Sequence, residues 1–335
     1  MSATEPTSTS GSFNDRANSL DVDALRRRAR IRVIVRATGL LLGAALIAAA
    51  IIYATRDQGT LEEVLAALDH ASPWSAAALA LCICANVALT GLLFSVLISR
   101  YGRVGILEMQ ALTAATALLN FLPLRPGLFG RVAYHRLVNG IAVADTAKVV
   151  VGSLVLTCVV SAALLGALVI AIAADASSAW PVAGVGALSA LGLADRRFRW
   201  ASAAFLIRLI DVLVWSLRYL IVFDLIGRPI GFEAALALSV ISIFATLVPF
   251  ISNGLGLREW AIGYAAPKMV DRLGGSLLDG RIAISAELVH RGMEIIVIGL
   301  CGGLGLLYLS ARKKRIIPTG EAAMQPAARS ADHHS

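Results

Sequence analysis

Long apolar stretches separated by short polar connections make up most of the chain. After about 30 residues rich in Ser, Thr, Asp and Asn, apolar segments run at 37–54, 73–98, 106–122, 147–172, 178–194, 200–226, 233–250 and 281–309. A helix that crosses a bilayer needs about 20 residues, whereas runs of about 10–14 more often lie buried or re-enter. The segments 106–122 and 233–250 are short by this measure, and each ends at a proline. The pattern predicts an all-α polytopic membrane protein with two unusual segments.

The two short segments resemble each other. Residues 111–123 read ALTAATALLNFLP and residues 237–249 read ALSVISIFATLVP. Upstream, GRVGILE at 102–108 parallels GRPIGFE at 227–233. Downstream, a Pro, Gly, Arg series recurs with one residue inserted, as Pro123, Gly127, Arg131 and as Pro249, Gly254, Arg258. An internal duplication of residues 73–172 and 200–309 explains this order. Chance similarity between two alanine-rich segments is the alternative.

Composition narrows the class of protein further. Hydrophobic residues make up 58% of the 335 residues and charged residues 16%, against about a quarter charged in soluble domains. That much apolar surface argues against a soluble enzyme, a disordered protein or a disulfide-stapled secreted domain. The four cysteines lie in apolar segments without the spacing of a zinc site or a disulfide framework. The sequence therefore predicts neither a metal nor a cofactor.

The positive charge is concentrated at the two ends of the chain. Of the net charge of +8, residues 1–36 and residues 311–335 contribute +3 each, and the core between them only +2. Basic tails beside membrane spans indicate contact with anionic lipid headgroups rather than with nucleic acid. Lys and Arg also favour the cytoplasmic side of a membrane. Both tails are therefore expected in the cytoplasm, with an even number of crossings.

The charges between the segments then favour one topology. With eight full spans, the basic stretch 125–148 and the cluster Arg196, Arg197 and Arg199 would lie outside. If the two short segments enter the membrane and return, six crossings remain and both clusters move to the cytoplasmic side. The first repeat then starts outside and the second inside, so the repeats are inverted. We expect about six full spans plus two re-entrant helical segments, with eight full spans as the alternative.

The turns after the two prolines are candidate binding sites. Proline ends an incoming helix, and Gly127, Gly254 and Gly256 allow tight turns and close approach of a ligand. Arg131 and Arg258 offer forked donors suited to phosphate. Alternatively, they reach the membrane interface from tight turns of purely structural role. Asn253 either caps the outgoing helix or binds a ligand, and capping is the more common role.

Ionisable residues inside the last segments form a second set of candidates. Glu287, His290, Arg291 and Glu294 share one helical face by their spacing, and Arg208, Asp211 and Arg218 share another. Three interpretations remain open for these faces. They form a polar groove for an anionic headgroup, a proton relay through Glu287, His290 and Glu294, or a structural ion-pair network.

These motifs also resemble a known family. Pro123, Gly127 and Arg131, followed by Gly140-Ile141, are similar to the first element of the lysylphosphatidylglycerol synthase transmembrane, or flippase-like, family. The run Gly254-Leu-Gly256-Leu-Arg258-Glu259 is similar to its second, Gly-x-Gly-x-Arg-Glu element. The resemblance covers roughly residues 37–310 and includes Arg291 and the glycines Gly299, Gly302 and Gly303 of the last span. Leu128 stands where the family usually has an acidic residue.

The resemblance implies a multi-pass protein of the bacterial cytoplasmic membrane. Only about 25 polar residues follow the final span, so the family's aminoacyl-transferase domain and its synthase activity are expected to be absent. What it implies instead is a flippase for an anionic phospholipid or lipid-linked phosphate. The expected binding residues are Arg131, Arg258, Glu259, Asn253, Gly127, Gly254, Gly256, Arg291, Glu287, Glu294, Arg208 and Asp211.

Two other functions remain open from the sequence. A membrane-embedded lipid-phosphate transferase would use paired acids around a divalent metal, but Asp271 with Asp279 and Asp175 with Asp195 lack recognisable spacing. A non-catalytic partner of another envelope protein would use its small-residue faces. Gly299, Gly302 and Gly303 suit helix packing within the chain or in a homo-oligomer.

Overall fold

All regular structure in the described part of the chain is helical. The computed structural model describes residues 38, 41–122, 125–175, 177–248, 252–272 and 278–316. The tail 1–36, the second tail beyond residue 316, Pro123 and Pro249 lie outside the described residues. Within these ranges the all-α expectation is confirmed.

The helices form two series, each with two short helices between two long ones. Helix Leu41–Thr55 and α2 (Gln58–Asp69) come first, and α7 (Ala179–Leu191) lies between the series. The first series is α3 (Pro73–Ile98), α4 (Ile106–Leu119), α5 (Pro126–Leu137) and α6 (Val143–Ala173), with 26, 14, 12 and 31 residues. The second is α8 (Arg199–Leu225), α9 (Phe232–Leu247), α10 (Leu257–Arg272) and α11 (Gly280–Ile316), with 27, 16, 16 and 37 residues.

Most of these helices match the apolar segments, but three do not. α2, α5 and α10 occupy stretches that the apolar pattern assigns to loops and turns. α10 carries several charged residues and has Pro267 inside it, so its composition resembles a polar connection. Tertiary contacts stabilise such helices where an apolar run does not predict them. The two turns therefore continue directly into helices α5 and α10.

Local sequence explains where the key helices begin and end. Ser72 accepts a hydrogen bond from the amide of Trp74 at 3.3 Å, and Pro73 occupies the first helical position of α3. α9 ends at Leu247, and Val248 is extended (φ −61°, ψ 116°). A residue that precedes a proline disfavours the helical conformation, so Pro249 accounts for that end. Arg125, before Pro126, is left-handed with φ 49°.

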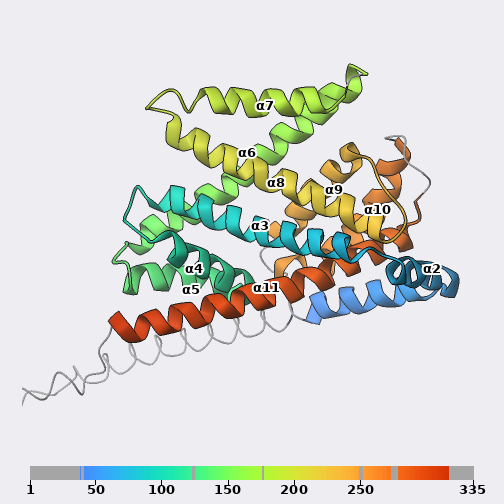
Figure 1. Cartoon of the computed structure of the whole chain (residues 1–335), viewed down its shortest axis with the longest axis horizontal. Helices are drawn as coiled ribbons and strands as arrows, with labels where there is room; N and C mark the ends of the chain where they lie inside the picture. The colour runs from blue at the N-terminus through green and yellow to red at the C-terminus, as the bar shows by residue number, and fades with distance from the viewer. Residues whose placement is uncertain are drawn as a thin grey trace, which may run out of the picture.

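The packing places the two short hairpins at opposite ends of the molecule. α3 packs along α8, and the hairpin of α4 and α5 lies toward the left in Figure 1, while α9 and α10 lie toward the right. α4 also lies directly on α11. A Cβ atom on Gly302 would lie 2.9 Å from the carbonyl oxygen of Ala114, and one on Gly305 would lie 2.5 Å from that of Ala111. Gly302 therefore packs helices within the chain, whereas Gly299 and Gly303 face open space.

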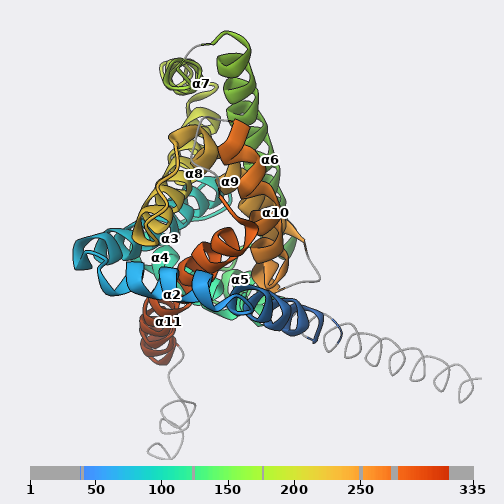
Figure 2. The same ribbon diagram turned by 90° about the vertical axis from the view of Figure 1, so that its right-hand side faces the viewer.

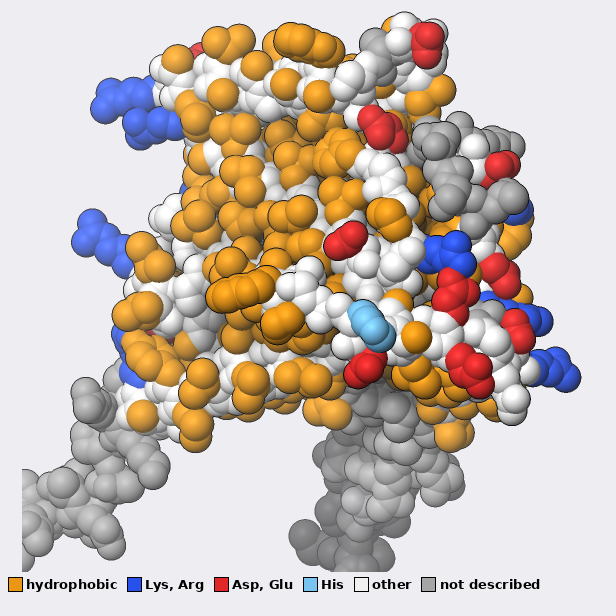
Figure 3. Space-filling view, turned by 45° about the vertical axis from the view of Figure 1, so that its right-hand side comes forward, with side chains coloured by type: hydrophobic (Ala, Val, Ile, Leu, Met, Phe, Trp, Pro, Cys, Tyr) orange, Lys and Arg blue, Asp and Glu red, His pale blue; other side chains and the backbone are white. Residues whose placement is uncertain are grey.

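The outer surface is that of a membrane protein. Hydrophobic side chains cover the middle of the molecule in Figure 3, and charged side chains gather at its two ends. In the described part of the chain, three helices are long and apolar enough to cross a bilayer: Pro73–Ile98, Val143–Ala173 and Gly280–Arg312. α7 lies at the upper edge of the molecule in Figure 2, where it packs against the neighbouring helices α6 and α8.

Candidate functional site

The polar face of α11 lies in the interior, where Arg258 from the start of α10 meets it. Arg258 is fully buried and its Nε donates to Glu287. Its Nη1 donates to Glu294 Oε2 at 2.9 Å. The arginine of the second turn thus lies between two carboxylates of the last helix. It does not reach the interface, as the alternative interpretation of this turn requires.

Arg291 ties the second turn to the same face of α11. Its Nε donates to Glu259 Oε1 at 3.0 Å, and its Nη2 donates to the backbone carbonyl of Asn253 at 3.1 Å. Its Nη1 also reaches Glu294 Oε2 at 3.3 Å. The guanidinium therefore connects α10, the turn before it and α11.

α8 contributes a second buried arginine from the opposite side. Arg218 donates from Nη2 to Glu294 Oε1 at 3.1 Å and from Nη1 to Asn86 Oδ1 of α3 at 3.2 Å. Its Cζ lies 4.0 Å from the ring centroid of Trp215, within range of a cation–π interaction. Tyr219 donates its hydroxyl to Glu287 at 2.8 Å. α8 and α10 therefore both reach the acids of α11, and α3 joins them through Asn86.

The predicted pair on α8 joins this network through an amide of α3. Arg208 Nη1 lies 2.5 Å from Asp211 Oδ2, and Asn86 Nδ2 donates to Asp211 Oδ1 at 2.8 Å. Because Asn86 also accepts from Arg218, its amide bridges Arg218 and Asp211 of α8. All the ionisable residues predicted for the last segments thus belong to one connected network.

His290 is neutral within this network, as its hydrogen bonds assign it. Arg218 Nε can only donate a hydrogen bond, and it lies 2.9 Å from His290 Nε2. His290 Nε2 is therefore the acceptor. In a neutral imidazole the proton is then on Nδ1, which lies 3.4 Å from Glu287 Oε2 and 3.3 Å from Arg258 Nη2. A relay through Glu287, His290 and Glu294 would need the second ring nitrogen to face Glu294, and it faces Arg218 instead.

The network carries no net charge. With His290 neutral, its four arginines are matched by four carboxylates: Arg208, Arg218, Arg258 and Arg291 against Asp211, Glu259, Glu287 and Glu294. Buried charges persist in low dielectric only when they are paired in this way. Of the three interpretations of these faces, the contacts describe an ion-pair network between helices.

Arg131, the arginine of the first turn, has different surroundings. It is 2% exposed, its Cζ lies 3.6 Å from the ring centroid of Phe94, and its Nη2 donates to Thr113 Oγ1 at 3.1 Å. Its Nε and Nη1 have no hydrogen-bond partner in the described part of the chain. No carboxylate of that part forms an ion pair with it. The buried charge of Arg131 therefore lacks the compensation that Arg258 has.

The tips of the two hairpins meet. Arg125, just before α5, donates from Nη2 to the carbonyl of Thr246 and, at 3.2 Å, to that of Val248. These carbonyls lie at the end of α9, where no following helical turn can satisfy them. At the start of α5, a Cβ on Gly127 would lie 2.3 Å from the carbonyl oxygen of Thr116, so α5 leaves the end of α4 at close range.

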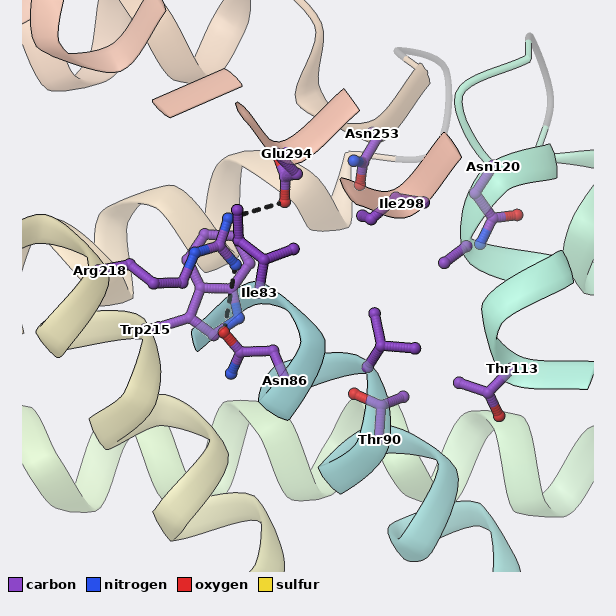
Figure 4. Close-up of a pocket in the computed structure, with 12 residues that line it drawn as sticks. Ile83, Asn86, Thr90, Thr113, Asn120, Trp215, Arg218, Asn253, Glu294 and Ile298 are labelled. Atoms are coloured by element: carbon purple, nitrogen blue, oxygen red, sulfur yellow. Dashed lines mark hydrogen bonds and ion pairs between the residues drawn. The ribbon is translucent and has the colours of Figure 1, made fainter. Parts of the chain in front are cut away.

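Between the hairpin tips lies a cavity of about 190 Å³. Its polar lining comes from α3, from α4 and the residue that ends it, from α8, from the second turn and from α11: Asn86, Thr90, Thr113, Asn120, Arg218, Asn253 and Glu294. Figure 4 shows Arg218 and Glu294 on one side, Asn120 and Thr113 on the other, and Thr90 below. Thr113 links the cavity wall to Arg131. Of the residues singled out from the sequence, Arg218, Asn253 and Glu294 line the cavity, and Arg131 is connected to it only through Thr113.

The second turn has the shape that its glycines allow. Gly256 has φ +79°, and a Cβ there would lie 2.2 Å from Cβ of Leu46 in the first helix. Gly254 is also left-handed, with φ +69°. Asn253 lies four residues before α10 begins at Leu257, so it does not hold the capping position. Its side chain lines the cavity instead.

Sequence reasoning missed the polar contributions of α3 and α4. Asn86, Thr90 and Thr113 lie within apolar helices and do not form a charged series. An amide such as Asn86 in the middle of a long apolar helix is the one signal that pointed to an interior partner.

Among the described residues, no three His, Cys, Asp or Glu side chains gather as they would around a metal ion. Neither a protein-family model nor a curated protein matches the chain.

Proposed function

We propose that this chain is a membrane translocator for an anionic lipid or a lipid-linked phosphate, related to the flippase-like family that its two turns resemble. The observation that carries the proposal is the polar cavity between the two helix series, at the place where the hairpin tips meet. Transporters built from repeats place their binding sites at such interfaces, near broken helices. A headgroup in this cavity would find polar partners while its acyl chains stay among apolar helices.

In this proposal the chain crosses the membrane six times, and the two hairpins enter from opposite sides and return. α4 has 14 residues, which corresponds to a length of about 21 Å and falls short of the hydrocarbon core of about 30 Å. The contact of Arg125 with the end of α9 joins the two tips. Both features favour re-entrant hairpins in an inverted repeat, rather than the alternative topology of eight full spans.

Charge supports one orientation. The connections α3–α4 and α7–α8 lie at the left-hand end in Figure 1 and carry mostly basic residues, namely Arg100, Arg103, Arg196 and Arg197 with Asp195. α2 and the start of α11 lie at the other end, where α2 carries Glu62, Glu63 and Asp69, and Asp279 directly precedes α11, which carries Arg281. Lys and Arg favour the cytoplasmic side. The basic end, where α11 also ends, is therefore the cytoplasmic one, in a bacterial cytoplasmic membrane.

The two arginines then have different roles. Arg258 holds the second half together through Glu287 and Glu294, and its charge is already balanced. Arg131 is the buried cation without a carboxylate, so an anion is the ligand that it lacks. Thr113 would release this guanidinium toward a phosphate in the cavity. The proposal requires no synthase chemistry.

The experiment measures lipid movement directly. Purified protein is placed in phosphatidylcholine vesicles that contain fluorescent phosphatidylglycerol, and a membrane-impermeant reductant destroys the outer-leaflet signal. The full chain is expected to expose the inner-leaflet pool, and Asn120→Leu to slow this about five- to tenfold by removing a polar cavity group worth about 1 kcal/mol. Thr55→Val, on the exposed end of the first helix, is the control. Vesicles with the full chain that behave like protein-free vesicles would contradict the proposal.

A further inference from the structure

A second hollow lies beside the cavity, on the surface that faces the membrane. This groove, with a volume of about 520 Å³, runs between α3, α4 and α11. Its residues include Cys84 and Ala88 of α3, Ala111 of α4, and Cys301 and Tyr308 of α11. From Cys301 to Tyr308 the helix rises about 10 Å. The groove therefore follows about a third of the hydrocarbon thickness of a bilayer of about 30 Å.

The lining of the groove suits hydrocarbon. It contains no charged side chain among the described residues. Its amide, Gln110, is turned toward α3, where Nε2 donates to the carbonyl of Ala88 at 3.0 Å. Gly91 leaves room for this amide, since a Cβ there would lie 2.1 Å from Gln110 Oε1. The close contact of Gly305 with Ala111 fixes the floor of the groove by packing α11 on α4.

The groove and the cavity are neighbours along all three helices. Val87 lines both. On α4, Ala114 lines the groove and Ala117, three residues on, lines the cavity. On α11, Cys301 lines the groove and Ile298, three residues earlier, lines the cavity. Residues three apart on a helix lie on one face, one turn from each other, so the polar cavity and the apolar groove adjoin through a wall one side chain thick.

We propose that the groove between α3, α4 and α11 holds an acyl chain of the lipid whose headgroup enters the cavity, and that the lipid passes sideways between α3 and α11 to reach it. This inference rests on the proposed function for the identity of the headgroup. A lipid has a polar head joined to apolar tails, and the cavity and the groove place matching surfaces next to each other. A water-soluble phosphate would have no use for the groove.

Binding is tested with a photoreactive tail. A phosphatidylglycerol that carries a diazirine in its acyl chain is added to phosphatidylcholine vesicles with the full chain, irradiated, and mapped by peptide mass spectrometry. Adducts are expected on the groove residues, several-fold above those on other lipid-facing stretches of α3. Ala88→Phe fills the groove and should remove them, whereas Ala77→Phe, exposed on the same helix, should not. Equal labelling of the groove and its surroundings would overturn the inference.

Passage is tested with the native thiols at the wall. Cys84 Sγ and Cys301 Sγ lie 3.9 Å apart and join α3 to α11. Copper phenanthroline oxidises the two thiols to a disulfide, with loss of two protons and two electrons that pass through Cu(II) to oxygen. Oxidation is expected to lower the rate of lipid movement at least about tenfold, and dithiothreitol should restore it. In the Cys84→Ser variant, copper phenanthroline should leave the rate unchanged. Unchanged movement in the locked protein would overturn lateral passage. Groove adducts without any lipid movement would leave the acyl site standing and contradict the translocator.

Discussion

Arg131 and Arg258 occupy corresponding places in the two halves, yet their surroundings differ. Both follow a Pro, Gly series and both are buried, Arg131 in the middle of α5 and Arg258 near the start of α10. Arg258 is bound by Glu287 and Glu294 of α11, whereas Arg131 has one hydroxyl partner, Thr113. The long helices that follow the two turns also differ. α6 buries Ser153, Thr157 and Ser161 on its interior face, where α11 presents acids.

A repeated motif therefore does not guarantee a repeated function. The same guanidinium is a structural cross-link where the following long helix supplies carboxylates, and an uncompensated charge where that helix supplies none. An ion pair offsets part of the desolvation cost of its buried charges, whereas an unpaired charge keeps that cost in full. The network of the second half is thus suited to hold helices together, and Arg131 is suited to bind an anion that comes and goes.

The largest expected effect separates the two arginines directly. Arg258→Met leaves Glu287 and Glu294 with fewer partners in the interior and should destabilise the protein by about 3–5 kcal/mol. Arg131→Met makes the same substitution but removes a charge that no carboxylate pairs with. It should therefore leave the free energy of unfolding unchanged or raise it. Thermal unfolding in detergent micelles measures both variants. Equal destabilisation by the two would remove the contrast between the halves.

The next effect gives Arg131 the partner it lacks. Thr113→Asp places a carboxylate where the hydroxyl now accepts, so stability should rise, and phosphatidylglycerol should no longer co-purify with the protein. Thr113→Val removes the hydrogen bond to a charged group and should cost about 1.5–3 kcal/mol. Lipid mass spectrometry measures the phosphatidylglycerol that co-purifies with each of the two variants, and thermal unfolding measures their stability. Retention of the anionic lipid by Thr113→Asp would mean that Arg131 does not hold it.

A smaller effect concerns the contact between the hairpin tips. Arg125→Gln shortens the donor that reaches the carbonyls of Thr246 and Val248, with a loss of about 1–3 kcal/mol. Because this contact joins the halves without touching either buried arginine, lipid retention should stay unchanged while unfolding occurs at a lower temperature. A loss of lipid with normal stability would instead place Arg125 in the binding site.

The smallest effect shows that burial, not the presence of an Arg–Glu pair, sets the difference. Arg228 and Glu63 form the same kind of pair at the surface, with the Glu63 side chain 47% exposed. Exposed pairs contribute about 0–1 kcal/mol and are screened by salt. Glu63→Gln should therefore change the unfolding temperature little, and less still at high salt. A loss as large as that of Arg258→Met would contradict the argument from burial.

Much of the fold is legible in the sequence because apolar periodicity and length decide it. The segment 73–98 predicts α3 with the same bounds, and the short segments 106–122 and 233–250 end near α4 and α9. α5 and α10 escaped prediction because they carry polar residues that only tertiary contacts stabilise. The shared face of Glu287, His290, Arg291 and Glu294 followed from helical spacing alone.

The sequence by itself determined the class of the protein, its apolar helices, its repeated turns and the residues with chemistry to offer. Local propensity, hydrophobicity and the period of the helix are properties of neighbouring residues, so they can be read along the chain. Only the tertiary structure decided the partners. It assigned two carboxylates to Arg258 and none to Arg131, and it brought Asn86 to Arg218 and the cavity to the hairpin tips. Charge compensation depends on distances between helices far apart in sequence, which a motif does not contain.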